Sequence, residues 1–180
     1  MRLFSNAGTN PRSPRKVQSL MMATDGLISG DRTLARDQLT DHVTRAASAL
    51  CSVGVAQGDV VALLLRNDFS FFEATGGAAL LGASTVPLNW HMSAEEIEYI
   101  LRDCGAKVLV GHTDLLTPEL VSHCRNIELI KAPTPAEVAQ AFQISGTDAQ
   151  LSLSTREWGS WIASQVPWTE SDRKSTRLNS

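Results

Sequence analysis

Residues 58–67 read GDVVALLLRN, and the unbroken apolar run at 60–65 within them decides the fold class. A strand with one face in water would alternate apolar and polar residues. A continuous apolar run of this length is typical of a strand buried on both faces, as in a parallel sheet. Gly58 and Asp59 form a turn before the run, and Arg66 ends it. The stretch therefore predicts an α/β protein.

Helical patterns flank this strand. In residues 35–53, apolar side chains recur on one helical stripe, with Asp37 near the amino end and Gly54 ending the helix. Residues 69–81 are apolar on most sides, which predicts a sandwiched helix ending at Gly82. Gly76 and Gly77 inside it cost about 1 kcal/mol each relative to alanine. We expect close contact between helix and sheet to offset that cost.

Further strand and helix patterns alternate along the chain. Residues 84–88, 107–110 and 127–130 predict short strands, and Ser93 with Glu96 forms a capping box that begins a helix ending at Gly105. Helices are expected near 118–124, 136–142 and 158–165. Alternation with short links predicts a largely parallel sheet with flanking helices and right-handed crossovers.

Composition excludes several classes of protein. The chain has 180 residues, of which 43% are hydrophobic and 19% charged, so it suits one domain or a large piece of a bigger one. No apolar run reaches about 18 residues, so no membrane span is expected. A net charge of −3 without a basic block gives no reason to expect nucleic acid. Three separated cysteines are typical of reduced thiols and a cytoplasmic protein.

The two ends differ in composition from the centre. Residues 1–30 are rich in Ser, Asn, Gly, Pro and Arg and are expected to be a mobile lead-in. Residues 31–171 carry the patterned domain. Residues 172–180, DRKSTRLNS, follow one reading frame of a common sequencing adapter and are excluded from fold reasoning. The alternative interpretation is a genuine basic tail.

Motifs for catalysis are hard to find from the residues alone. The sequence has no Walker loop, no GxGxxG between strand and helix, and no CxxC, so no metal site is predicted. His123 and Cys124 are neighbours whose side chains point about 100° apart on a helix, which disfavours a base–nucleophile pair. Trp158, Trp161 and Trp168 are expected to cover the core rather than stack on a ligand.

A resemblance to a known family is more informative. Residues 49–55 (ALCSVGV), 58–67 (GDVVALLLRN), 81–89 (LGASTVPLN) and 93–110 (SAEEIEYILRDCGAKVLV) match in order and spacing. Together, residues 35–116 resemble the N-terminal region of the AMP-binding, acyl-adenylate-forming acyl-CoA synthetases and ligases. Residues 89–91 (NWH) and 112–116 (HTDLL) are similar to the branch acting on fatty, aromatic or alicyclic acids.

The resemblance implies a fold and an activity. The fold would be an incomplete part of the large N-terminal domain of the adenylate-forming enzymes. ATP would activate a carboxylic acid as an acyl-adenylate with Mg²⁺, and coenzyme A would then take the acyl group. The family's phosphate loop, Thr-Glu pair, ribose-binding Asp and C-terminal Lys are not in this sequence. We therefore expect a truncated scaffold of a fatty-acid-metabolising ligase, itself inactive.

One site residue can be carried over. Some relatives place an Arg that contacts a coenzyme A phosphate two positions after the Asn of the Pro-x-Asn signature, and His91 stands there in this chain. A neutral histidine donates one hydrogen bond but lacks a fixed charge. His91 is thus a candidate for the mouth of the coenzyme A channel, with a surface loop histidine as the alternative. Asn89 is expected to hold the turn.

Two other functions stay open. The chain could belong to an adenylation domain of a peptide synthetase, where a carrier protein supplies the thiol. It could also be a stand-alone, non-catalytic α/β binding module. A sheet cut before its remaining strands would expose an apolar edge, so we expect the truncated chain to self-associate.

Overall fold

The computed structural model describes residues 26–144, 155–169 and 171–172. Five parallel strands form one sheet in the order β4-β3-β5-β6-β7. Their bounds are β3 Val60–Leu64, β4 Ser84–Pro87, β5 Ala106–His112, β6 Glu128–Ala132 and β7 Arg156–Glu157. The α/β class and the parallel sheet are confirmed.

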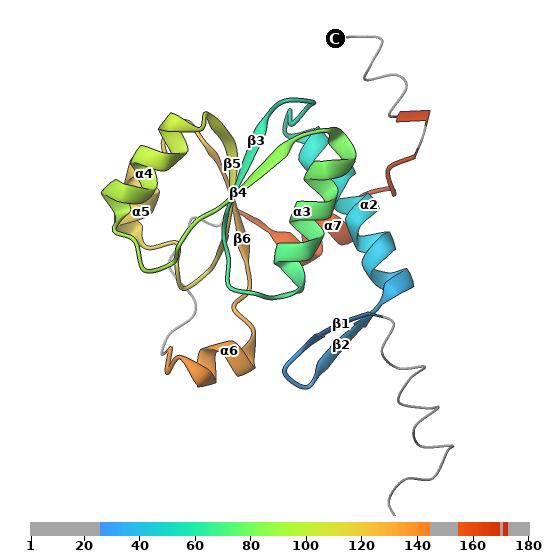
Figure 1. Cartoon of the computed structure of the whole chain (residues 1–180), viewed down its shortest axis with the longest axis horizontal. Coiled ribbons are helices and arrows are strands. Elements are labelled where there is room, and N and C mark those ends of the chain that lie inside the picture. The colour runs from blue at the N-terminus through green and yellow to red at the C-terminus, as the bar shows by residue number, and fades with distance from the viewer. Residues whose placement is uncertain (1–25, 145–154, 170, 173–180) are drawn as a thin grey trace, which may run out of the picture.

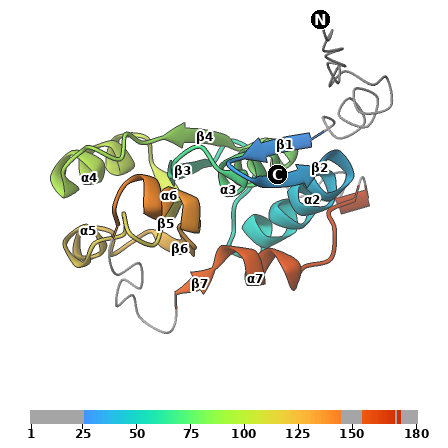
Figure 2. The same ribbon diagram turned by 90° about the horizontal axis from the view of Figure 1, so that it is seen from below.

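Helices cover both faces of this sheet (Figure 1). On one side lie α2 (Arg36–Ser52), α3 (Phe69–Leu81) and α7 (Trp158–Ala163), and on the other lie α4 (Ala94–Asp103) and α5 (Pro118–His123). The turned view separates the same two layers (Figure 2). The short helix α6 (Ala136–Ala141) follows β6 at one end of the sheet.

Strand β3 explains why the decisive apolar run is unbroken. Val61 and Leu63 point into the core beneath α2, α3 and α7. Ala62 and Leu64 point into the second core beneath α4 and α5. Because successive side chains of a strand alternate between faces, burial on both faces requires apolar residues at every position.

Two helix ends lie where the sequence predicts them. Ser93 Oγ accepts a hydrogen bond from the Glu96 amide at 3.3 Å, and Glu96 Oε2 accepts one from the Ser93 amide at 2.8 Å. Gly82 ends α3 in the left-handed region at φ +75°. The capping box and this helix end are therefore confirmed.

The glycine pair in α3 has a different partner from the expected one. A Cβ on Gly77 would lie 2.8 Å from the Cβ of Ala46, and one on Gly76 would lie 2.7 Å from Val43 Cγ2. Both neighbours belong to α2, so the glycines permit close helix–helix packing. The expectation of a helix–sheet contact was wrong because two helices share this face and must cross beside each other.

An antiparallel hairpin precedes the sheet. Its strands are β1 (Gly26–Ser29) and β2 (Arg32–Ala35), paired from Gly26↔Ala35 to Ser29↔Arg32. Sequence patterning did not predict it, and residues 26–30 of the expected lead-in belong to it. Residues 1–25, and most of the proposed adapter-encoded tail, lie outside the described residues.

A buried carboxylate joins the three helices of one layer. Glu73 on α3 is only 5% exposed. Its Oε2 accepts a hydrogen bond from Trp158 Nε1 of α7 at 2.7 Å, and its Oε1 lies 2.7 Å from His42 Nδ1 of α2. Trp158 and Trp161 belong to the core of this layer, and Trp168 packs against it. The expected core role of these tryptophans is confirmed.

Candidate functional site

Polar and aromatic side chains gather where the parallel strands end. Loops that follow the carboxyl ends of parallel strands meet at one edge of a sheet, which is where ligands bind in open α/β folds. Here the loops after β3, β4, β5 and β6 supply the side chains. We therefore treat this carboxyl edge as the candidate site.

An ion pair links the ends of β3 and β5 at this edge. Arg66 Nη1 and Nη2 donate to Asp114 Oδ1 and Oδ2 at 3.0 and 2.8 Å, and both side chains are 8% exposed. Thr134, after β6, donates to Asp114 through its hydroxyl group. Burial raises the pKa of the Asp114 carboxyl group, but hydrogen bonds from Arg66 and Thr134 outweigh burial and leave the pKa below its usual value.

His112 lies beneath this pair. It is the last residue of β5 and is 0% exposed. Its Nδ1 accepts a hydrogen bond from the Arg66 backbone amide at 3.3 Å, so the proton of the neutral ring lies on Nε2. Burial lowers the pKa of the imidazole from 6.5 to about 4, and the ring is uncharged at neutral pH. Nε2 has no hydrogen-bond partner among the described residues.

The turn after β4 carries the predicted site residue. His91 is exposed, and its ring centroid lies 3.5 Å from that of Trp90. The His91 amide donates to Asn89 Oδ1 at 3.1 Å, which confirms that Asn89 holds the turn. His91 thus lies at the carboxyl edge with its side chain accessible.

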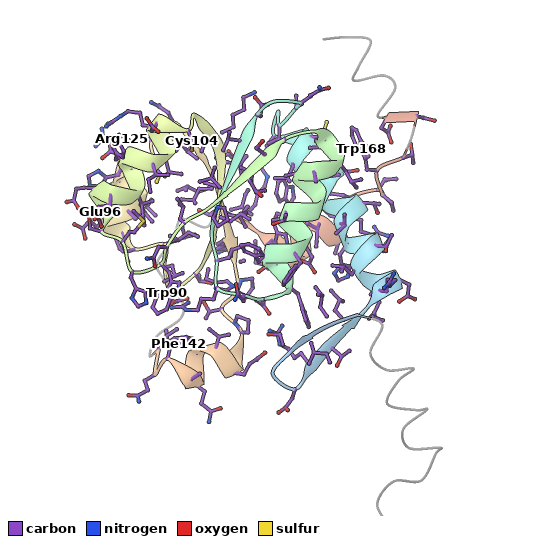
Figure 3. All side chains as sticks on the ribbon, in the orientation of Figure 1. Trp90, Glu96, Cys104, Arg125, Phe142 and Trp168 are labelled. Carbon is purple, nitrogen blue, oxygen red and sulfur yellow. The ribbon has the colours of Figure 1, made fainter. Side chains whose placement is uncertain are left out.

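Trp90 connects this turn to the buried ion pair. The Arg66 guanidinium carbon lies 4.8 Å from the Trp90 ring centroid and 5.0 Å from that of Phe142. The two rings meet edge to face, with 5.2 Å between their centroids, and Figure 3 labels both residues at the same end of the molecule. Cation–π contacts of this kind fix a guanidinium that is already bound to a carboxylate.

A second arginine, Arg32, links the hairpin to residues at the same edge of the sheet. Arg32 of β2 pairs with Asp68, which precedes α3, and with Glu137 of α6. Its guanidinium carbon also lies 4.7 Å from the centroid of the Phe69 ring. The hairpin and α6 are therefore joined at the end of the sheet that carries Arg66 (Figure 1).

The other candidates from the sequence do not form a reactive site. His123 Nδ1 lies 2.6 Å from Glu98 Oε2, and both residues line a surface pocket of about 640 Å³ beside α4 and α5. Cys124 is buried, and burial raises the pKa of its thiol to about 11. A thiol with this pKa stays protonated at neutral pH and is a poor nucleophile.

The Arg66 guanidinium is engaged by partners within the chain. Arg66 uses its terminal nitrogens on Asp114 and lies against two rings, so it does not present a free charge to a phosphate. Within residues 26–144, 155–169 and 171–172, no group of three metal-ligating side chains is found. In the same ranges, no helix is both long and apolar enough to cross a membrane.

Sequence reasoning missed Arg66, His112 and Asp114 as site residues. A usable signal was present, because two of them follow the predicted strands at 60–65 and 107–110. Polar residues directly after buried parallel strands share one edge. Their pairing across 48 positions still required the strand order.

Comparison with known proteins assigns the family. Residues 13–173 match the family described as AMP-binding enzyme. The chain therefore belongs to this family, and the expected resemblance is confirmed.

Two relatives match different lengths of the chain. The chain is 40% identical over 82 residues to the long-chain-fatty-acid–CoA ligase FadD13 of Mycobacterium tuberculosis, covering 46% of this chain and 16% of FadD13. It is 30% identical over 111 residues to surfactin synthase subunit 1 of Bacillus subtilis, covering 62% of this chain and 3% of that protein. The matched regions are thus small parts of both relatives.

A solved structure matches over most of the chain. The anthranilate CoA ligase AuaEII, in complex with anthranoyl-AMP, aligns with a TM-score of 0.66 and 26% identity, over 82% of this chain and 26% of that one. The match confirms that the fold is part of the adenylate-forming fold.

Proposed function

We propose that this chain is the N-terminal scaffold of an ATP-dependent acyl-CoA synthetase. In the whole protein, a carboxylate attacks the α-phosphorus of ATP to give an acyl-adenylate and pyrophosphate. The coenzyme A thiol then attacks the acyl carbon, loses its proton and releases AMP. The observation that carries this proposal is the 40% identity to FadD13 across residues of the scaffold.

The adenylation step needs groups beyond this segment. A carboxylate is a poor acyl donor, and adenylation supplies its leaving group. Stabilising the charge on the transferred phosphoryl group requires Mg²⁺, basic side chains and loop amides. The phosphate loop and the catalytic lysine of the family are not in this sequence. We infer that the segment alone neither adenylates nor transfers, and that it self-associates through exposed core.

His91 is our candidate for contact with coenzyme A. It is exposed at the carboxyl edge, on a turn held by Asn89. A neutral imidazole there can donate one hydrogen bond to a phosphate oxygen. The preferred acids, whether fatty, aromatic or alicyclic, would be selected elsewhere in the whole protein.

The test compares the full-length protein with the 180-residue chain. Exchange of labelled pyrophosphate into ATP reports adenylation, with octanoate, benzoate and cyclohexanecarboxylate as probes. We expect acid-dependent exchange and CoA thioester formation in the full-length protein and neither in the segment. Exchange by the segment itself would contradict the scaffold role, and no exchange by either chain with any acid would contradict the enzyme.

A second candidate is the adenylation domain of a peptide synthetase. It is favoured by the match to surfactin synthase subunit 1, which covers 62% of this chain. In such an enzyme the thiol belongs to a carrier protein. Exchange with amino acids, without thioester formation on free coenzyme A, would favour this function over the first.

A further inference from the structure

Trp90, at the tip of the turn after β4, packs against the guanidinium group of Arg66. Backbone contacts hold the base of the turn, where the Leu88 amide donates to the Leu63 carbonyl at 2.9 Å and the Met92 amide to the Asn89 carbonyl at 3.1 Å. The Trp90 ring instead lies over Arg66, with 4.8 Å between the guanidinium carbon and the ring centroid. The lateral position of the tip therefore depends on where Arg66 is held.

Arg66 is held by residues at the end of β5, and through Asp114 by a residue after β6. Asp114 after β5 binds two of its terminal nitrogens, and Thr134 after β6 binds Asp114. The Arg66 backbone amide donates to His112 at the end of β5. With its side chain 8% exposed, the guanidinium has little freedom to move.

Stability alone is a weak reason to bury such a pair. The cost of removing two charges from water often cancels their attraction, so apolar replacements can be equally stable. A planar guanidinium with a fixed fork does supply orientation, which neither lysine nor an apolar residue reproduces. The arrangement suits a part that must be held in one position.

We propose that Arg66, fixed by Asp114, is a positioning residue for the Trp90–His91 turn and acts on the coenzyme A step but not on adenylation. This inference rests on the proposed role of His91 in coenzyme A binding. The chain of contacts runs from Asp114 to Arg66, from Arg66 to Trp90, and from Trp90 to His91, whose ring centroid lies 3.5 Å from that of Trp90.

The test measures the two half-reactions of the full-length enzyme separately. In Arg66→Met we expect the KM for coenzyme A to rise about tenfold, less than the roughly hundredfold loss that a 1 Å misplacement can cause. The rate of pyrophosphate exchange without coenzyme A should stay within about twofold of the wild-type rate, because the turn does not act on ATP. The KM of Arg66→Lys for coenzyme A should lie between those of the wild type and Arg66→Met, since lysine keeps the charge but lacks the planar guanidinium.

A double-mutant cycle separates this inference from the function on which it rests. If Arg66 acts through His91, then Arg66→Met should raise the KM no further in a His91→Ala background. Lys107→Gln, at the opposite end of β5, is the matched control and should leave the KM unchanged. If Arg66→Met does not fold, Trp90→Leu removes the contact between Arg66 and Trp90 by changing the half-buried tryptophan instead. It should likewise raise the KM for coenzyme A and leave the rate of pyrophosphate exchange almost unchanged.

The outcomes are distinct. No effect of His91→Ala on the KM for coenzyme A overturns the proposed role of His91. An effect of His91→Ala with none from Arg66→Met and Trp90→Leu overturns the positioning role. Independent, multiplicative effects of Arg66 and His91, or an equal loss in both half-reactions, also overturn it.

Discussion

Two ion pairs connect β3 with β5, one at each end of the strands. At the amino end, Lys107 Nζ binds Asp59 Oδ2 at 2.8 Å, with 52% and 20% of the two side chains exposed. At the carboxyl end, Arg66 binds Asp114 at 2.8 Å with both side chains 8% exposed. The two ion pairs thus have the same contact distance, but one is exposed to water and the other is buried.

The difference shows that burial and partners, rather than distance, set the importance of an ion pair. Water solvates the Lys107 ammonium group and screens its attraction to Asp59, so such pairs contribute little. Arg66 and Asp114 have lost most of their water and depend on each other, on Thr134 and on neighbouring rings. Perturbing the two ends should therefore have very different effects.

The largest expected effect is that of Asp114→Ala. It leaves the Arg66 charge buried without its carboxylate, which should lower the free energy of unfolding by about 3–5 kcal/mol. Urea denaturation followed by tryptophan fluorescence measures the loss. The double variant Arg66→Met/Asp114→Leu should lose less than Asp114→Ala, because no lone charge remains. A loss below about 1 kcal/mol for the single variant would remove the contrast between the two ends.

The next largest effect is expected from mild acid, which should lower stability through His112 at the carboxyl end of β5. Burial lowers the pKa of His112 from 6.5 to about 4 in the folded chain, so between these pH values the unfolded chain binds more protons. Stability should then fall by about 3 kcal/mol as the pH drops from 6.5 to 4, measured by urea denaturation at each pH.

Two variants serve as references for this acid effect. His112→Gln should flatten the dependence in this range. The pKa of Asp59 is lowered from 3.8, because bonds from Lys107 and the Ala56 amide outweigh its desolvation. Lys107→Gln should therefore lose a small amount of stability above about pH 4, a difference that disappears at lower pH as Asp59 is protonated. It should keep the same acid-dependent loss between pH 6.5 and 4 as the wild type. A flat wild-type profile between pH 4 and 6.5 would contradict the buried, neutral state of His112.

A substitution without charge gives an intermediate measure of sensitivity to packing. In Gly77→Ala the new Cβ would lie 2.9 Å from the backbone carbon of Ala46, which cannot move without shifting α2. We expect a loss of about 1–3 kcal/mol, seen as a lower urea midpoint. Gly76→Ala is the matched control and should cost less, because it meets the side chain of Val43. Equal stability of Gly77→Ala and wild type would contradict the close α2–α3 contact.

The smallest effect is expected for Lys107→Gln. Loss of the exposed contact with Asp59 should change the free energy of unfolding by no more than about 1 kcal/mol. The difference from wild type should shrink further in 1 M salt, where the Debye length is about 3 Å. A larger, salt-insensitive loss would show that the amino end resembles the carboxyl end.

Much of the fold could be predicted because its signals are local. The unbroken run at 60–65 shows a doubly buried strand, and Ser93 with Glu96 marks a helix start within four residues. The hairpin at β1 and β2 was missed because its short strands lie next to a Pro-, Gly- and Ser-rich segment. Its place over the sheet depends on Arg32 reaching Asp68 and Glu137, which are distant in sequence.

The candidate site was only partly predictable. The sequence singled out Asn89, which completes a Pro-x-Asn signature, and His91, which stands two positions later and whose contact with coenzyme A stays a prediction. Phe142 gave no signal, since nothing local relates it to Trp90, 52 positions earlier by residue number. Its contact with Arg66 exists because β6 lies beside β5 and α6 follows at the same edge.

The sequence by itself determined the α/β class, most of the strand and helix positions, and the family, because periodicity, caps and turns act over a few residues. Only the tertiary structure decided that Gly76 and Gly77 face α2, and that Arg66 meets both Asp114 and Trp90. Those contacts depend on strand order and on the register that pairs Leu64 with Gly111. Register and order arise from the packing of the whole sheet, and no short stretch of sequence encodes them.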